Sequence, residues 1–337
     1  MSTTPLVFSA TGTIETYVVP ATGNYVIEAA GAQGGAGGGP GGKGARVRGT
    51  FFLNAGDLVQ IVVGQQGTAG TTPLQSGGGG GGGSFVWKGT QDRLHPAAAG
   101  GSNSVYLWPS DSASSFFPSH PMLAAGGGGG GNGNDAVVTT EAVRGSASGG
   151  RNGHGGSADW GDFHYSGGGG AGWRSNGAQG SAPTFCAGGG HWAGGVGANY
   201  QGHQGGCGGF GGGGGGSFIG CGSGGGGGYS GGGGGTLRGP GGGGGGSYNA
   251  GAEQLNTPGI QTGDGYVTIL AFTPLGDSAG LAPAIPRDEL LAGHAALHPP
   301  AQPPMPREEK HAEPTAESLS VRLWRAACSP LHRSYRP

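Results

Sequence analysis

The densest group of side chains capable of specific chemistry lies in SADWGDFHYSGGGGAGW, residues 157–173. It combines carboxylates, an imidazole and several aromatic rings, and aromatic residues are enriched where protein interfaces gain most of their binding energy. We predict a ligand-binding set of Asp159, Trp160, Asp162, Phe163, His164, Tyr165 and Trp173, joined by His191 and Trp192 from the similar segment HWAGGVGANY. The alternative interpretation is that these rings cap the ends of the glycine tracts around them.

Histidine and cysteine come close together in the sequence at two places. His191 follows Cys186 by five residues, and His203 precedes Cys207 by four, which brings together two residue types that bind zinc. The CxxC and HxxxH spacings of zinc sites are absent, so we predict neither a metal site nor a cofactor.

No arrangement of residues points to catalysis. GGPGGKG, residues 38–44, approaches a phosphate-binding loop, but Gly44 stands where a serine or threonine would bind magnesium, and no helical pattern follows. No serine lies on a scaffold such as a nucleophile elbow. We therefore predict that the protein is not an enzyme.

Three of the four cysteines, Cys186, Cys207 and Cys221, fall in the glycine-rich half of the chain, and Cys328 lies near its end. Four cysteines allow several pairings, and the sequence does not choose among them. We favour a disulfide between Cys207 and Cys221, because closing a short loop restricts a very flexible chain. Free thiols are an equally supported alternative.

Composition excludes several classes of protein. Glycine supplies 90 of the 337 residues, far above the average usage of about 7%. The net charge is -2 and the basic residues are scattered, so we expect no nucleic-acid partner. No run approaches the roughly 20 apolar residues of a membrane helix, and MSTTPLVFSATG lacks the features of a secretory signal. As written, the chain is expected neither to insert into a membrane nor to carry an export signal.

Alternating apolar residues predict β-strands on both sides of the glycine-rich region. About eight strands suffice for an antiparallel sandwich of two sheets. The predicted strands are residues 16–20, 24–32, 45–53, 57–64, 84–89, 104–108, 121–125 and 265–272. The sets expected to share a face are Tyr25, Ile27 and Ala29; Val47, Phe51 and Leu53; Val59, Ile61 and Val63; and Val267, Ile269 and Ala271.

The glycine tracts require a different structure. They interrupt the strict three-residue repeat of collagen, and a plain linker would not need the aromatic residues between them. Interior glycine also disfavours ordinary helix and sheet. The remaining choice is the extended threefold helix, with about 3.1 Å per residue and all main-chain groups directed outward. Because those groups need partners, we predict a bundle in which neighbouring glycine helices bond to one another. The tracts are residues 77–83, 126–131, 167–170, 211–216, 224–228, 231–235 and 241–246.

These patterns divide the chain in two. Residues 1–272 form one predicted domain, with strands mainly in 6–125 and 263–272 and the polyglycine bundle mainly in 126–248. From residue 273 the chain is rich in proline, alanine and charged residues, so we predict a disordered tail over 273–337. A short helix across residues 318–328 is the alternative there.

Strands and glycine tracts together resemble a known family. The matching stretches are NYVIEAAGAQGG (24–35), GGKGARVRGTFFLNAGDLVQIVVGQQG (41–67), GGGGGGGSFVWK (77–88), PMLAAGGGGGGNG (121–133), GGFGGGGGG (208–216) and GDGYVTI (263–269). Most of residues 8–272 thereby resembles the glycine-rich ectodomain of the anaplastic lymphoma kinase and leukocyte tyrosine kinase receptors and related bacterial glycine-rich proteins. The resemblance implies an all-β, tumour-necrosis-factor-like sandwich of jelly-roll type with an inserted polyglycine-II bundle, and an extracellular or cell-surface location.

The function expected from this resemblance is binding without catalysis. We expect an extracellular or surface-displayed module that presents loops on a rigid glycine lattice to a protein or a cell-surface glycan. Two alternatives stay open at this point: a ligand-binding ectodomain fragment of a signalling protein like the receptor tyrosine kinases, and a tail adhesin of a phage or virion.

Overall fold

A computed structural model describes residues 4–71, 76–89, 120–159, 165–180, 186–190, 192–200, 203–218, 222–236 and 241–272. All of them belong to one compact unit. The described residues form β-strands, turns and extended segments, and no helix occurs among them. The predicted strand 104–108, the tail 273–337 and the alternative helix 318–328 lie outside the described residues.

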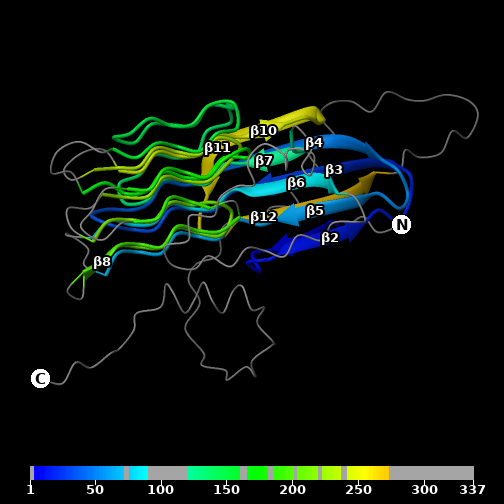
Figure 1. Cartoon of the computed structure of the whole chain (residues 1–337). Helices are drawn as coiled ribbons and strands as arrows, with labels where there is room; N and C mark the ends of the chain where they lie inside the picture. Colours follow the sequence, from blue (N-terminus) through cyan, green and yellow to red (C-terminus); the bar gives the residue numbers. More distant parts are fainter. Residues whose placement is uncertain are drawn as a thin grey trace, which may run out of the picture. The chain divides into compact units, whose positions relative to one another are not determined.

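Two five-stranded antiparallel sheets account for most of the strands (Figure 1). Sheet A has the order β1 (Leu6–Ser9), β12 (Tyr266–Phe272), β3 (Gly23–Ala30), β4 (Gly44–Leu53), β11 (Ala252–Gln261). Sheet B has the order β10 (Tyr248–Asn249), β7 (Leu123–Ala125), β6 (Ser84–Gly89), β5 (Leu58–Val62), β2 (Ile14–Val18). A separate hairpin joins β8 (Asn199–Tyr200) and β9 (His203–Gln204).

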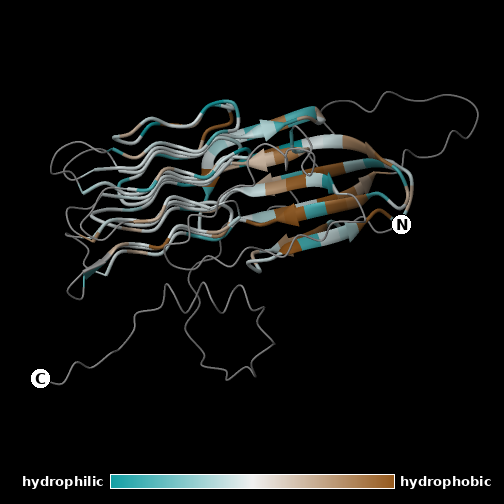
Figure 2. Cartoon of the chain, in the orientation of Figure 1, coloured by the Kyte–Doolittle hydropathy of each residue, from teal (hydrophilic) through white to brown (hydrophobic). Residues whose placement is uncertain are grey.

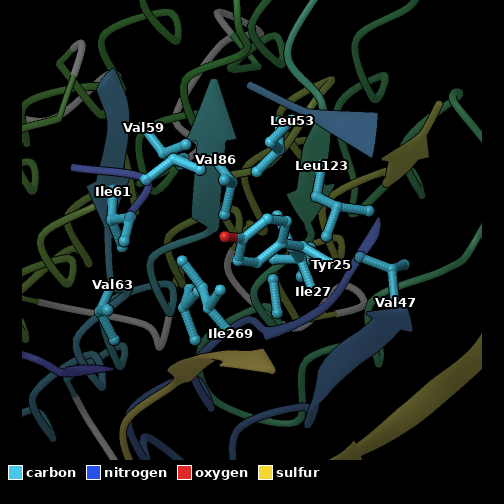
Figure 3. Packing of buried hydrophobic residues seen from close by; sticks show 14 residues of the cluster. Tyr25, Ile27, Val47, Leu53, Val59, Ile61, Val63, Val86, Leu123 and Ile269 are labelled. Atoms are coloured by element: carbon cyan, nitrogen blue, oxygen red, sulfur yellow. The ribbon is translucent and has the colours of Figure 1, made fainter. Parts of the chain in front are cut away.

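The two sheets share one apolar core, which Figure 3 shows from close by. Sheet A contributes Tyr25, Ile27 and Val47, and sheet B contributes Val59 and Ile61. The alternation in the sequence thus predicts the buried faces correctly, as expected for antiparallel strands with one face on the core. One predicted inward residue is wrong, because Ala271 lies exposed near the end of β12.

β11 is absent from the prediction. It pairs with β4 through an irregular register and contains Pro258 as well as Gly259, whose φ is +55°. Its side chains are mostly polar and exposed, so they carry no alternating apolar signal. Proline and bulges are typical of an edge strand, which has one unpaired side and needs protection from other strands.

The glycine-rich segments between the strands run side by side from one end of the two sheets (Figure 1). Strongly apolar residues gather in the strands, whereas the glycine-rich segments are close to neutral in hydropathy (Figure 2). They include not only the tracts after residue 126 but also residues 31–37, 64–70 and 76–83, which leave and re-enter the sheets directly. What stabilises this part of the molecule must therefore differ from an apolar core.

Candidate functional site

Main-chain hydrogen bonds with a three-residue repeat connect the glycine-rich segments. In residues 77–83, the N–H groups of Gly77, Gly80 and Gly83 donate to the carbonyl oxygens of Ser217, Gly214 and Gly211, at 2.8, 2.8 and 2.9 Å. The N–H groups of Gly79 and Gly82 donate to Thr68 and Gln65 at 3.0 and 2.9 Å. Every third residue thus faces the same neighbouring segment.

Carbonyl groups of the same segment follow the same repeat. The carbonyl groups of residues 79 and 82 accept from the N–H groups of residues 35 and 32. The carbonyl groups of 77 and 80 accept from 206 and 209, and the carbonyl groups of 78 and 81 accept from 224 and 227. With the bond from Gly81 to Gly128, residues 77–83 contact six neighbouring segments. Some of these neighbours run parallel to the segment and others run antiparallel.

Side chains are excluded from these contacts. A Cβ atom on Gly80 would lie closer than 3.0 Å to the carbonyl oxygen of Gly225, and one on Gly128 would meet the carbonyl of Gly42 in the same way. The absence of Cβ atoms therefore lets the main chains approach closely enough to bond on all sides.

Serine recurs at the ends of the tracts, where its hydroxyl bonds to main-chain groups of neighbouring segments. Ser84 Oγ donates to the Ala30 carbonyl at 2.6 Å and accepts from the Gly64 N–H at 2.9 Å. Ser247 Oγ donates to the Val137 carbonyl at 2.6 Å and accepts from the Gly126 N–H at 3.0 Å. Both residues are fully buried. We did not single them out from the sequence, although a serine directly before or after most glycine tracts is the visible signal.

Four aromatic residues at turns of the glycine-rich region cover the outer face of sheet B. Trp173, Trp192, Phe210 and Tyr229 pack with Val62, Phe85, Trp87 and Ala124 in one buried cluster. The strand register places these last four residues opposite the core face. The rings of Trp87 and Trp192 stack at 5.2 Å, and Trp173 meets both of them edge-on.

Burial changes the interpretation of two predicted ligand residues. Trp173 and Trp192 are only 3% and 6% exposed. In this structure they are packing residues that join the glycine-rich region to sheet B, as the capping alternative supposes, and we remove them from the binding set. The identity of a residue as tryptophan gave no means to distinguish the two roles.

The predicted loop is divided between two ends of the glycine-rich region. Tyr165 packs edge-on against Phe218 at 5.9 Å, beside the buried Cys186 and Ala198. Trp173 follows eight residues later, and an extended segment at about 3.1 Å per residue places it about 25 Å away. Asp159 stays near Tyr165, because its carbonyl accepts from Ser166 Oγ at 2.8 Å. The remaining predicted residues, Trp160, Asp162, Phe163, His164 and His191, lie outside the described residues.

The two cysteines among the described residues have different states. Cys207 is disulfide-bonded, but Cys221 lies outside the described residues, so their pairing stays a prediction. Cys186 is a free, buried thiol whose Sγ donates to the Ser166 carbonyl at 2.8 Å. Burial raises the pKa of the Cys186 thiol to about 12, which keeps it protonated and unreactive at neutral pH. No cluster of three potential metal ligands occurs in the described part of the chain.

A polar network on the outer face of sheet A also brings ionisable residues together. Tyr266 Oη donates to Glu28 Oε1 at 2.7 Å. Burial, and then the hydrogen bond with Glu28, raise the pKa of Tyr266 well above its ordinary value, while Arg46 acts in the opposite direction. Tyr266 is therefore neutral at physiological pH and donates its hydroxyl proton to the hydrogen bond with Glu28.

Comparison with known proteins found no match to this chain, either among protein-family models or among curated protein sequences. Within the described residues, the structure contains no helix with the length and apolar character that a membrane crossing requires.

Proposed function

We propose that this protein is a non-catalytic binding and structural module. It combines a tumour-necrosis-factor-like sandwich of jelly-roll type with a bundle of polyglycine-II helices, and it presents loops from the ends of that bundle. The observation that carries the proposal is the bonding of residues 77–83 to six neighbouring segments with a three-residue repeat. A threefold extended helix directs its main-chain groups outward at this spacing.

Energetics support a rigid bundle. Ordering one residue costs about 1–2 kcal/mol of backbone entropy, and one hydrogen bond contributes about 0.5–1.5 kcal/mol net. In residues 77–83, six of the seven N–H groups donate to other segments. The two effects are therefore comparable, and the aromatic cluster on sheet B adds the apolar burial that favours order.

The recognition surface in this proposal is the end of the bundle remote from the aromatic cluster. Asp159 and Tyr165 lie there, and the β8–β9 hairpin lies close by, since the N–H of Gly205 donates to Ala198 in the cluster with Tyr165. We propose a protein or a cell-surface glycan as the partner. The disulfide at Cys207 supports an extracellular or cell-surface location, because disulfides persist in oxidising compartments.

Hydrogen exchange on the full chain tests the bundle. Amides of residues 77–83 and 126–131 should exchange slowly, because each is buried and most donate to a neighbouring segment. Rapid exchange throughout residues 208–248 would instead mean a flexible linker and would overturn the proposal.

Two alanine variants test the binding role. Tyr165→Ala should weaken binding to a glycan array or to whole cells while the protein stays folded, whereas Trp173→Ala should lower stability. If neither the glycan array nor whole cells bind the wild-type protein, a library of purified extracellular proteins is the second probe. A Tyr165→Ala protein that binds as tightly as wild type would place the recognition surface elsewhere.

A further inference from the structure

The outer faces of the two sheets differ in their surroundings. Aromatic residues of the glycine-rich region cover the outer face of sheet B. Of the seven large apolar side chains exposed among the described residues, four lie on the outer face of sheet A: Val7, Phe52, Leu255 and Phe272. Exposed apolar side chains gathered on one face mark an interaction surface.

Register divides this face into a part that carries the phenylalanines and a charged part that has Val7 and Leu255 at its edges. At one end of the sheet, Phe272 and Phe52 flank Asn24, and in the next row Leu270 lies beside Val26. In the row after that, Glu28 lies directly opposite Arg48. Side chains opposite each other in antiparallel strands are about 5 Å apart at Cβ, so each row forms a continuous stripe.

Charge on the face is balanced. Arg46 and Arg48 lie on the charged part with Glu28, and Glu253 Oε2 accepts from Thr50 Oγ1 at 3.1 Å at its border. Two positive and two negative groups do not select a partner of one sign. A second copy of the chain, turned about a twofold axis, does fit, because it brings Glu28 of each copy to Arg48 of the other, in addition to the interactions that both residues make within their own chain.

Size also fits a dimer. Five strands spaced about 4.8 Å apart, over about eight residues of about 3.3 Å, give a face of about 600 Å². Two copies would bury about 1,200 Å², which is the lower end of specific interfaces. We propose that the outer face of sheet A is the interface of a symmetric homodimer, with apolar contacts through Phe52 and Phe272 and reciprocal Glu28–Arg48 pairs.

Charge reversal tests the pairing directly. The full chain should form a concentration-dependent dimer in light scattering or sedimentation. Glu28→Arg alone and Arg48→Glu alone should each be monomeric, because each homodimer would juxtapose like charges. An equimolar mixture of the two variants should restore a dimer, since the mixed pair regains opposite charges at both contacts. Glu141→Arg, which reverses an exposed charge of the glycine-rich region, should dimerise like wild type.

A second variant protects the test against misfolding, because Glu28→Arg also removes the acceptor of Tyr266. Phe52 is 62% exposed, so Phe52→Asp should leave the fold intact by circular dichroism and abolish the dimer. A wild-type chain that stays monomeric at millimolar concentration, a Phe52→Asp chain that still dimerises, or a mixture that stays monomeric would each overturn the proposal.

Discussion

The missing Cβ atom decides which residues the interior of the glycine-rich region can contain. A Cβ on Gly80 would meet the carbonyl of Gly225, which is main chain and cannot rotate away. Gly80→Ala should therefore lower the free energy of unfolding by about 1–3 kcal/mol or more, as overpacking does. Denaturant unfolding followed by circular dichroism measures this change.

Gly23 provides the matched control, because no atom lies within 4 Å of a Cβ built there. Gly23→Ala should be neutral or should stabilise by up to about 1 kcal/mol through the unfolded chain. Equal losses of stability in Gly80→Ala and Gly23→Ala would show that close main-chain packing is not the cause.

The hydroxyl groups of buried serines connect neighbouring segments, because each both donates and accepts a hydrogen bond. Ser247→Ala removes the acceptor of the Gly126 N–H and the donor to the Val137 carbonyl. Leaving buried polar groups without partners costs about 1–3 kcal/mol, and we expect a loss of that size in the free energy of unfolding. Ser148→Ala, at an exposed position, should change stability by less than about 0.5 kcal/mol. A Ser247→Ala protein as stable as this control would contradict the role.

Cys186 makes stability depend on pH. Burial raises its pKa from 9.0 to about 12 in the folded protein. The thiol of the unfolded chain ionises at lower pH than the buried thiol. The free energy of unfolding is therefore unaffected by this group below about pH 9, and it falls as pH rises from about 9 to about 12, by up to about 1.4 kcal/mol per pH unit. Cys186→Ala should flatten the pH dependence of urea unfolding across this range. Any effect of Tyr266 on the pH dependence is common to both proteins. An identical slope of unfolding free energy against pH in wild type and variant would therefore exclude Cys186 as the cause.

The turns that carry the aromatic rings bind the glycine-rich region to sheet B. Trp192 has a φ of +65°, a conformation that costs a non-glycine residue energy, while its ring stacks on Trp87. Trp192→Ala should lose about 3–5 kcal/mol of stability. Trp192→Gly should lose about 1 kcal/mol less, because glycine adopts positive φ without penalty. Thermal or urea unfolding of the two variants measures the difference, and a glycine variant no better than alanine would contradict strain at this turn.

Sequence patterns predict the core strands because alternation and burial coincide there. Residues 84–89 form β6 as predicted, and Ile27 and Ile61 lie in the shared core. β11 carries no such alternation, since pairing with β4 and not apolar burial maintains it. Short β10 is likewise defined by its partner β7.

The sequence predicts the candidate site less completely, because its residues lie on extended segments and the sequence does not show how these segments are arranged in space. Tyr165 and Trp173 belong to one cluster in the sequence, but the intervening tract directs them to two different clusters of the structure. Composition identifies residues that can bind a ligand. Only the arrangement of the segments decides that Trp173 is buried against sheet B.

At the scale of the whole molecule, burial is unusually polar. Unfolding an ordinary domain raises the heat capacity by about 12–15 cal/mol/K per residue, because exposed apolar surface raises it more than exposed peptide groups lower it. In this chain the described glycine-rich segments bury mainly peptide groups, and apolar burial is concentrated between and against the sheets. We therefore expect a heat-capacity change per ordered residue well below the ordinary range. Calorimetry across a series of pH values measures it, with hydrogen exchange defining the number of ordered residues. A value within the ordinary range would mean that apolar surface, and not bonding between main chains, supplies most of the stability.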